Sequence, residues 1–440
     1  MEILTKPIVG KMDCFLGIQW GDEGKGKEID ETVSNYDAVC RFQGGPNAGH
    51  TYEFNGVTII GHLMPSGCFH EYVDLIIGNG VVLNPVSFNK EYYDLKSKGI
   101  DVIKRLFISE RAKLITYLHP FLDAAEECRM GKKCVGSTMS GIGPTYRDFK
   151  ARQVPLIGDI LRSNFIDQLT DFLSFQMNVL KMYEESYGYV IPHEKIEEKR
   201  FEWFESLEMM YKYNICDTSE LIRKKLEQGK RILAEGAQGA MLDNDFGDYP
   251  FVTSSNTLTA NLCLGLGVPH QAIGEVNGVI KAYVTKVGGG SFPSKIKDKE
   301  VEEAYREAGH EYGATTGRPR MCGWLDMVAL KRAIYLTGTT GIFINKTDIC
   351  PVDTVKVVVG YLDKDGNKFE NFPLHLEDVV DVETIEFPGW GSNVFGVTEK
   401  SKLPQELISY IQYIDDEISP LGTKIKLLGT GPKRGQSVVW

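Results

Sequence analysis

The sequence predicts an α/β fold with a large, mostly parallel central sheet flanked by helices. Short apolar or β-branched runs alternate with helical patterns, which is the order of elements in a parallel sheet with crossover helices. Several runs also end in a polar or glycine-rich motif, as expected where ligands bind at the carboxyl edge of such a sheet. Strands are expected at 14–19, 38–43, 75–77, 232–234, 279–284, 341–345 and 355–361.

The segment 159–229 has a different character, because it is rich in Phe, Leu, Met, Glu and Lys. Its apolar residues, among them Phe165, Leu169 and Phe172, recur at helical spacing, which predicts a helical subdomain packed on the sheet. No repeat, low-complexity segment or long linker divides the chain. Residues 1–440 are therefore predicted to form a single domain that includes this helical subdomain.

The net charge of the 440 residues is −11, which argues against a general binder of polyanions such as duplex nucleic acid. No apolar stretch reaches the roughly 18 residues of a membrane helix, and the first residues lack the pattern of a signal peptide. The nine cysteines are dispersed without a C-x-x-C pair, so neither a disulfide framework nor a zinc site is indicated. These features predict a cytoplasmic protein that binds neither nucleic acid nor membranes.

A glycine-rich turn with two lysines, residues 17–27, follows the first predicted strand. Such a turn can cradle a phosphate, because glycines let backbone N–H groups approach an anion and a lysine adds positive charge. Residues 21–27 fit the spacing G-x-x-x-x-G-K, but Glu28 stands where that motif has a magnesium-binding Ser or Thr. The loop instead contains Asp22 and Glu23, so a metal ligand or a base is expected inside the turn. A plain strand-to-helix turn is the alternative, and the acid pair together with both lysines argues against it.

Nine motifs follow one another along the chain: QWGDEGKGK, GGPNAGHT, GIGPTY, EGAQG, YPFVTSSNT, ATTGRPR, CGWLD, NKTD and GTGP. With these motifs in this order, the chain resembles the adenylosuccinate synthetase family over essentially its whole length. The resemblance implies a GTP-dependent ligase of purine biosynthesis. In that reaction GTP phosphorylates the 6-oxygen of IMP, and the amine of L-aspartate then displaces the phosphate to give adenylosuccinate.

The resemblance implies that Asp22, His50 and Gln238 are the catalytic residues. A carboxylate inside a cationic loop stays ionised, so Asp22 is the candidate base for the N1 proton of the purine. His50 can donate a hydrogen bond to the 6-oxygen or to the β-phosphate. Gln238 offers a donor and an acceptor to the edge of inosine. One Mg²⁺ is implied, with the Asp22 carboxylate and the Gly49 carbonyl as ligands.

The implied GTP site combines the glycine-rich loop with the NKTD motif. Lys25 is expected at the γ-phosphate. A carboxylate can accept from both N1–H and the exocyclic amine of guanine, so Asp348 is expected to select GTP over ATP, with the Lys346 stem over the ring. The predicted GTP-binding residues are Gly21, Glu23, Gly24, Lys25, Gly26, Lys27, Lys346, Asp348, Gly429 and Gly431.

The resemblance also implies the sites for IMP and L-aspartate. Arg152 is expected to reach the active site of a partner subunit across a homodimer. Two arginines that flank a proline suit bidentate capture of carboxylates, which favours Arg318 and Arg320 for the amino acid. The IMP-binding set is Asn47, Thr138, Arg152, Gln238 and Thr253, and the aspartate-binding set is Thr315, Thr316, Arg318 and Arg320.

Some residues depart from the family pattern near the amine-acceptor site. Ser140 stands where a basic residue is expected, and loss of one charge-assisted contact typically costs about 1.5–3 kcal/mol. Lys286, Ser291 and Met321 also replace the usual residues. Arg147, Lys150 and Lys286 are the candidates to compensate for the missing charge.

Two alternative functions follow from these observations. The departures at Ser140 and Met321 are compatible with a diverged member that joins a different amine to a purine nucleotide. A variant that uses a 2-aminopurine nucleotide is disfavoured, because Asp22 is present. A non-catalytic GTP-binding regulator would use the glycine-rich loop and NKTD but would not require Asp22, His50 and Gln238.

Overall fold

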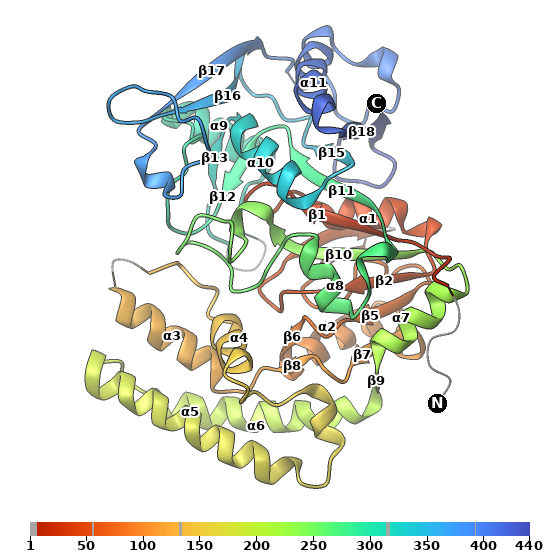
Figure 1. The fold of residues 1–440 in the computed structure, drawn as a ribbon, viewed down its shortest axis with the longest axis vertical. Helices are drawn as coiled ribbons and strands as arrows, with labels where there is room; N and C mark the ends of the chain where they lie inside the picture. The colour runs from red at the N-terminus through yellow and green to blue at the C-terminus, as the bar shows by residue number, and fades with distance from the viewer. Residues whose placement is uncertain (1–6, 55–56, 132–133, 314–316, 392) are drawn as a thin grey trace.

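A ten-stranded sheet forms the centre of the computed structural model (Figure 1), which describes residues 7–54, 57–131, 134–313, 317–391 and 393–440, without the side chains of 50–60. Every pair of neighbouring strands in this sheet is parallel except the antiparallel pair β18 and β19. In spatial order the strands are β19 (Ser437–Val439), β18 (Lys424–Gly429), β15 (Gly341–Asn345), β11 (Ile273–Lys281), β1 (Met12–Gly17), β10 (Ile232–Gly239), β2 (Ala38–Arg41), β5 (Asp74–Ile77), β7 (Leu106–Ser109) and β9 (Asn214–Cys216).

The remaining strands form four small sheets that are separate from the central one. They are the pairs β3 (His50–Phe54) with β4 (Val57–Gly61), β6 (Val82–Leu83) with β8 (Lys113–Leu114), and β12 (Val284–Lys286) with β13 (Met321–Gly323), and the triplet β14 (Leu325–Asp326), β16 (Thr354–Leu362) and β17 (Asp381–Pro388). The α-helices are α1 (Lys25–Thr32), α2 (Pro85–Ser97), α3 (His119–Met130), α4 (Ile142–Lys150), α5 (Phe165–Tyr187), α6 (His193–Met209), α7 (Thr218–Glu227), α8 (Ala260–Leu266), α9 (Lys299–Gly309), α10 (Met327–Thr337) and α11 (Gln405–Ile418).

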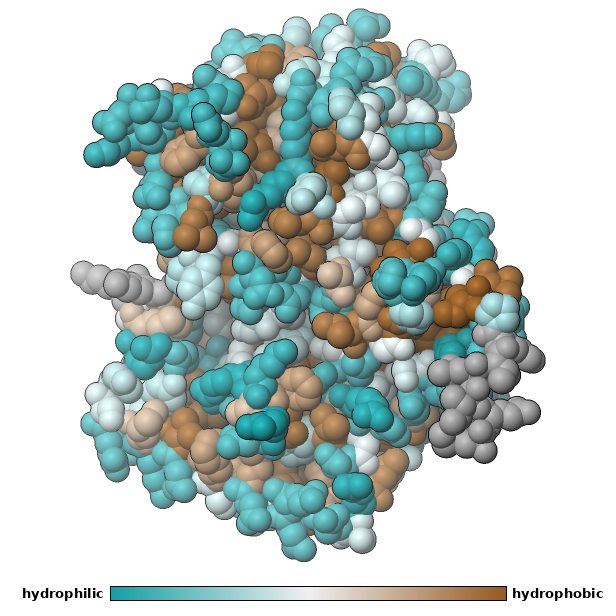
Figure 2. Space-filling view, viewed as in Figure 1, coloured by the Kyte–Doolittle hydropathy of each residue, from teal (hydrophilic) through white to brown (hydrophobic). Residues whose placement is uncertain are grey.

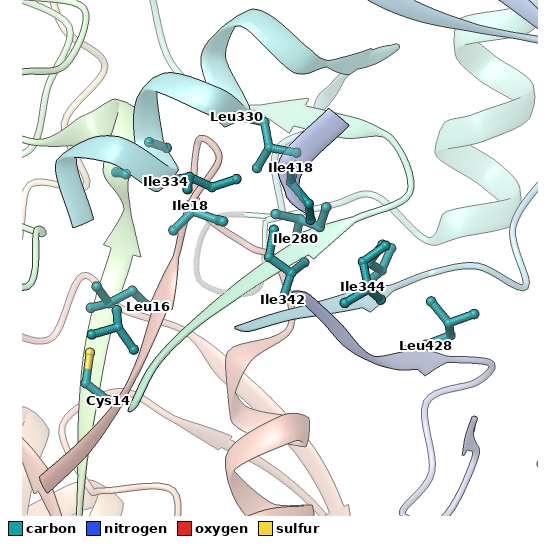
Figure 3. Packing of buried hydrophobic residues seen from close by; sticks show 14 of the residues in the cluster. Cys14, Leu16, Ile18, Ile280, Leu330, Ile334, Ile342, Ile344, Ile418 and Leu428 are labelled. Carbon is teal, nitrogen blue, oxygen red and sulfur yellow. The ribbon is translucent and has the colours of Figure 1, made fainter. Parts of the chain in front are cut away.

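Helices cover both faces of the sheet, so its strands are buried on both sides. Alternate residues of β1 illustrate this: Cys14 and Leu16 belong to the cluster that includes α10 and α11, whereas Phe15 packs with Ile29 of α1. Figure 3 shows the first cluster, with Leu330 of α10 near Ile280 and Ile342 of the neighbouring strands. The strands therefore read as continuous apolar runs rather than as an alternating pattern.

A helical layer formed by α3 to α6 lies below one end of the sheet (Figure 1). Within the segment 159–229, α5 and α6 provide its long helices. The end of the same segment returns to the central sheet, because β9 pairs with β7 in parallel and α7 follows it. Hydrophilic residues cover much of the visible face, and the hydrophobic residues form separate patches (Figure 2).

The mostly parallel sheet is confirmed. Of the expected strands only 341–345 has its observed bounds, most of the others differ at their ends, and two were wrong in a larger way. The stretch 279–284 does not form one strand, because the Gln19 side chain bonds to the backbone of Lys281 and Tyr283 and separates β11 from β12. The stretch 355–361 is strand β16, which belongs to the three-stranded sheet rather than to the central one. In the described part of the chain, no helix is both long enough and apolar enough to cross a membrane.

Candidate functional site

A cavity of about 1540 Å³ opens beyond the carboxyl ends of β1, β2, β10 and β15. The loops that follow these strands line it, together with the loop that precedes α4 and the segment after α9. Parallel strands place their carboxyl ends at one edge, so motifs far apart in sequence meet there. The predicted residues that line the cavity are Gly21, Asp22, Glu23, Gly24, Lys25, Gly26, Lys27, Asn47, Gly49, Thr138, Gln238, Thr253, Arg318, Arg320, Lys346, Asp348 and Gly431.

The glycine-rich loop owes its shape to Glu23, whose side chain is fully buried. One carboxylate oxygen of Glu23 accepts hydrogen bonds from the backbone N–H groups of Gln19 and Gly21. The other oxygen lies 2.8 Å from Nζ of Lys25, which also donates to the Gln238 carbonyl. Glu23 therefore holds the backbone of the loop in place. It also fixes Lys25, the residue that is expected at the γ-phosphate of GTP.

Asp22 occupies a left-handed backbone conformation, with φ of 59°. This conformation is uncommon for residues other than glycine, and Asn and Asp tolerate it best. It directs the loop so that Asp22 faces the cavity, with its side chain 35% exposed. The predicted base is thus held by a strained turn, which is a frequent property of functional loops.

The NKTD motif is joined to the glycine-rich loop. The side-chain amide of Asn345 donates to the carbonyls of Glu23 and Gly24 at the beginning of α1. Lys346 and Asp348 line the cavity beside this junction, and burial raises the pKa of the Asp348 carboxyl. Gly429 is not part of the cavity wall, but its carbonyl accepts a hydrogen bond from Thr347 and so supports the motif.

Glu28 lies one turn inside α1, and its side chain is fully buried. Neither carboxylate oxygen has a hydrogen-bond partner, and Nζ of Lys27 lies 3.7 Å away. Burial raises the pKa of Glu28 from 4.5 to about 7. The residue that replaces the Ser or Thr of the G-x-x-x-x-G-K-[ST] pattern therefore points into the protein and does not line the cavity.

The Glu28→Gln substitution is expected to stabilise the protein at alkaline pH and not at acidic pH. An acid with a raised pKa in the folded state contributes most stability below pH 4.5 and loses it as the pH rises to about 7. Above pH 7 the full difference, at most about 3 kcal/mol, should appear in the free energy of unfolding. Urea unfolding at pH 5 and pH 8 measures it, with Glu370→Gln on the exposed surface as control. An equal effect at both pH values would contradict the prediction.

The loop that contains Thr138 is held by two carboxylates of α3. Glu127 accepts hydrogen bonds from the backbone N–H groups of residues 135–137. Asp123 accepts from the Ser137 hydroxyl and from the N–H of Gly141. These contacts order the loop that brings Thr138 to the wall of the cavity.

Several residues of the cavity wall have a buried polar atom without a hydrogen-bond partner among the described residues, and two of these atoms belong to the predicted IMP site. They are Oδ1 of Asn47 and Nε2 of Gln238, and Gln238 also has a left-handed backbone with φ of 57°. Buried unpaired polar groups are unusual in proteins and often mark a place that a ligand completes. The His50 backbone begins β3 directly after Gly49, and its side chain lies outside the described part of the structure.

Arg320 connects the predicted base to a buried carboxylate. Its Nε lies 2.8 Å from Oδ2 of Asp22, and its Nη1 lies 2.6 Å from Oε2 of Glu311. Glu311 also accepts from Lys281 and from the Tyr283 hydroxyl. Arg318 lines the same cavity, whereas Thr315 and Thr316 lie outside the described residues.

The departures from the family pattern have distinct structural consequences. Nζ of Lys286 is buried and bonds to Asp248 and to the Ser291 carbonyl, so it does not replace the charge missing at Ser140. Ser140 bonds to Thr138 and borders a separate, smaller cavity beside α6. Of the other two candidates, Arg147 lines the main cavity and Lys150 does not.

Two predicted residues, Gly429 and Arg152, do not line the cavity of their own chain. Gly429 acts indirectly, because its carbonyl accepts the hydrogen bond from Thr347 of NKTD. Arg152 is exposed, has a left-handed backbone with φ of 65°, and does not line the cavity.

Sequence reasoning missed the charged residues that support the site. Glu23 was expected to contact GTP, and its role in shaping the loop was not foreseen. Glu311, Lys281, Asp123 and Glu127 were not singled out, because an isolated Glu or Lys reads as a solvated surface residue. Only Glu311 carried a local signal, because it lies three residues before the ATTGRPR motif.

Comparisons with known proteins identify the family of the chain. The family model for adenylosuccinate synthetase matches residues 14–438. The adenylosuccinate synthetase of Parabacteroides distasonis is 42% identical over 430 residues, which cover 98% of this chain and 99% of that protein. The enzyme of Flavobacterium johnsoniae is 44% identical over 429 residues, covering 97% and 99%.

Solved structures of related enzymes have the same fold as this chain. The fully ligated adenylosuccinate synthetase of Plasmodium falciparum superimposes with a TM-score of 0.88 at 32% identity, covering 98% of this chain and all of that chain. A succinoaminodeoxyadenylate synthetase of cyanophage S-2L shares the fold, with a TM-score of 0.63 at 19% identity. The chain therefore belongs to the adenylosuccinate synthetase family, the GTP-dependent ligases that join L-aspartate to IMP.

Proposed function

We propose that the 1540 Å³ cavity binds GTP, IMP and L-aspartate side by side, and that Asp22 is the base at the point where the three meet. The observation that carries this assignment is the arrangement around Asp22. Its carboxylate follows a phosphate-binding type of loop, faces the cavity, and contacts Arg320, a residue of the predicted amino-acid site. Asp22 thereby connects the glycine-rich loop of the proposed nucleotide site with Arg320 of the proposed amino-acid site.

The GTP end of the cavity is assigned to the glycine-rich loop and NKTD. Backbone N–H groups at the beginning of α1 and the Lys25 ammonium would hold the phosphates, because a helix N-terminus and a cation both favour negative charge. Asp348 would accept the two N–H donors of guanine. Asn345, which ties NKTD to Glu23 and Gly24, would keep the base and phosphate sites at a fixed separation.

The IMP end is assigned to Asn47, Thr138, Gln238 and Thr253. The unpaired Nε2 of Gln238 and Oδ1 of Asn47 are a donor and an acceptor that a purine nucleotide would satisfy. Asp22 would remove the N1 proton, which makes the 6-oxygen a nucleophile toward the γ-phosphate of GTP. His50 would stabilise the charge that develops during this transfer. The amine of aspartate, held by Arg318 and Arg320, would then displace the phosphate.

Mg²⁺ is the cofactor that the residues present would accommodate. The Asp22 carboxylate and the Gly49 carbonyl both belong to the cavity wall, and hard cations prefer oxygen ligands of this kind. When bound, the ion would neutralise charge on the phosphates of GTP. Asp22 uses Oδ2 for Arg320, and its other oxygen has no partner among the described residues.

The functional unit is proposed to be a homodimer in which Arg152 completes the IMP site of the partner subunit. Arg152 is exposed and lies outside the cavity of its own chain, so it is available to a second copy. We assign the protein to the cytoplasm because all nine cysteines are free thiols, as is usual in a reducing compartment.

The direct test follows the near-ultraviolet absorbance of the purified protein with IMP, GTP and Mg²⁺, with L-aspartate added last. A rise in absorbance that depends on aspartate is expected as adenylosuccinate forms. The rise should disappear without Mg²⁺ and when ATP replaces GTP. Release of phosphate with other amines but not with aspartate would contradict the assignment of the amine site.

A further inference from the structure

Glu311 is a charged residue that the proposed chemistry does not use, although its side chain is completely buried. Burial alone would raise the pKa of its carboxyl, but Lys281 and Arg320 outweigh burial and lower this pKa to about 2. Glu311 is therefore an anion throughout the physiological pH range. A buried ion pair is weak evidence for a role in stability, because well-packed apolar residues in place of both partners are often as stable, so the position of Glu311 invites a functional explanation.

We propose that Glu311 is a positioning residue, which holds the guanidinium of Arg320 between Asp22 and the site of the amino-acid carboxylate. This inference rests on the proposed function. The contact of Nη1 with Oε2 of Glu311 fixes the far end of the side chain at 2.6 Å. Nε then lies 2.8 Å from Asp22, and Arg320 lines the cavity, where a substrate carboxylate can reach its guanidinium.

The backbone around Arg320 reinforces this placement. Its N–H donates to the carbonyl of Glu311, and its own carbonyl accepts from Nε of Arg306. The two residues thus form the base of a hairpin that contains Arg318 nearer its tip. Arg320 is held both through its main chain and through its side chain.

Other residues bond to one carboxylate oxygen of Glu311 and leave the second oxygen to Arg320. Lys281 and Tyr283 both bond to Oε1, at 3.0 and 2.6 Å, whereas Arg320 bonds to Oε2. Lys281 is only 1% exposed, so the pair of charges is shielded from water and from salt. This arrangement fixes one carboxylate oxygen rigidly and directs the other at Arg320.

The assignment predicts a selective defect in the Glu311→Gln variant. A neutral amide is a weaker partner for a guanidinium, so Arg320 should lose its fixed position. The KM for L-aspartate is expected to rise about 10- to 100-fold, which corresponds to one charge-assisted hydrogen bond. The KM values for GTP and IMP should stay within about threefold of the wild type. Glu300→Gln, on the exposed face of α9, is the matched control.

A second variant distinguishes two roles of Glu311, namely positioning Arg320 and neutralising the charge of Lys281. Glu311→Gln leaves Lys281 as an unpaired buried charge, which by itself can destabilise the protein. The double variant Lys281→Met/Glu311→Gln removes both charges and should recover the melting temperature while the KM for aspartate stays high. Recovery of both values would overturn the proposal and leave Glu311 a structural residue, as would an unchanged KM in the single variant. Absence of activity in the wild type would instead reject the proposed function.

Discussion

The Asp22→Asn variant is expected to lose about 10³-fold in kcat, because general-base catalysis typically contributes 10²–10⁴-fold. Asparagine has the shape of aspartate and tolerates the left-handed backbone of residue 22, so the loop should keep its conformation. It cannot accept the N1 proton of IMP. Steady-state kinetics together with the melting temperature measure the effect.

The Asp22→Ala variant should be similarly inactive, and it tests how much the backbone matters. Alanine is strained at φ of 59°, so this variant should also be somewhat less stable than Asp22→Asn. Asp245→Asn, on an exposed turn, provides a control for loss of a charge. Substantial turnover by both Asp22 variants would exclude this residue as the base.

The inactive Asp22→Ala variant also serves to test the shared active site. When it is mixed with Arg152→Ala under conditions of subunit exchange, half of the randomly formed dimers are mixed, and each contains one complete site. Roughly a quarter of the wild-type activity should therefore return. No recovery, with exchange demonstrated, would show that Arg152 acts within its own chain or not at all.

The Asp348→Asn variant is expected to change the nucleotide preference. The carboxylate would accept two hydrogen bonds from guanine, and loss of this charge should lower kcat/KM for GTP about 100-fold. The amide N–H of asparagine can instead donate to the 2-oxygen of xanthine, so xanthosine triphosphate should become the better substrate. Competition between the two nucleotides measures the switch.

Asp353→Asn is the appropriate control for this experiment, because Asp353 follows the same motif and is exposed. It should leave the preference for GTP unchanged. Burial raises the pKa of the Asp348 carboxyl, so the wild type should also lose GTP affinity at acidic pH as this group becomes protonated. An unchanged preference in Asp348→Asn would remove this residue from the guanine site.

Much of the fold could be predicted from short-range patterns. Continuous apolar runs that end in glycine-rich or polar motifs identified β1, β2, β10 and β15, and β15 was predicted with its observed bounds. The end of β11 could not be predicted. The apolar run continues through residue 284, and only the side chain of Gln19, 262 positions away from Lys281, bonds to the backbone where pairing stops.

The sequence by itself determined the family and the parallel sheet, and most of the site residues it predicted line the cavity, because each motif contains its own turn and its own polar side chains. Only the tertiary structure decided how these motifs support one another. Glu23 braces its loop, Lys286 is engaged by Asp248, and Arg320 joins Asp22 to Glu311. Such contacts depend on distances between distant segments, and a charged residue reveals its partner only after folding has removed both from water.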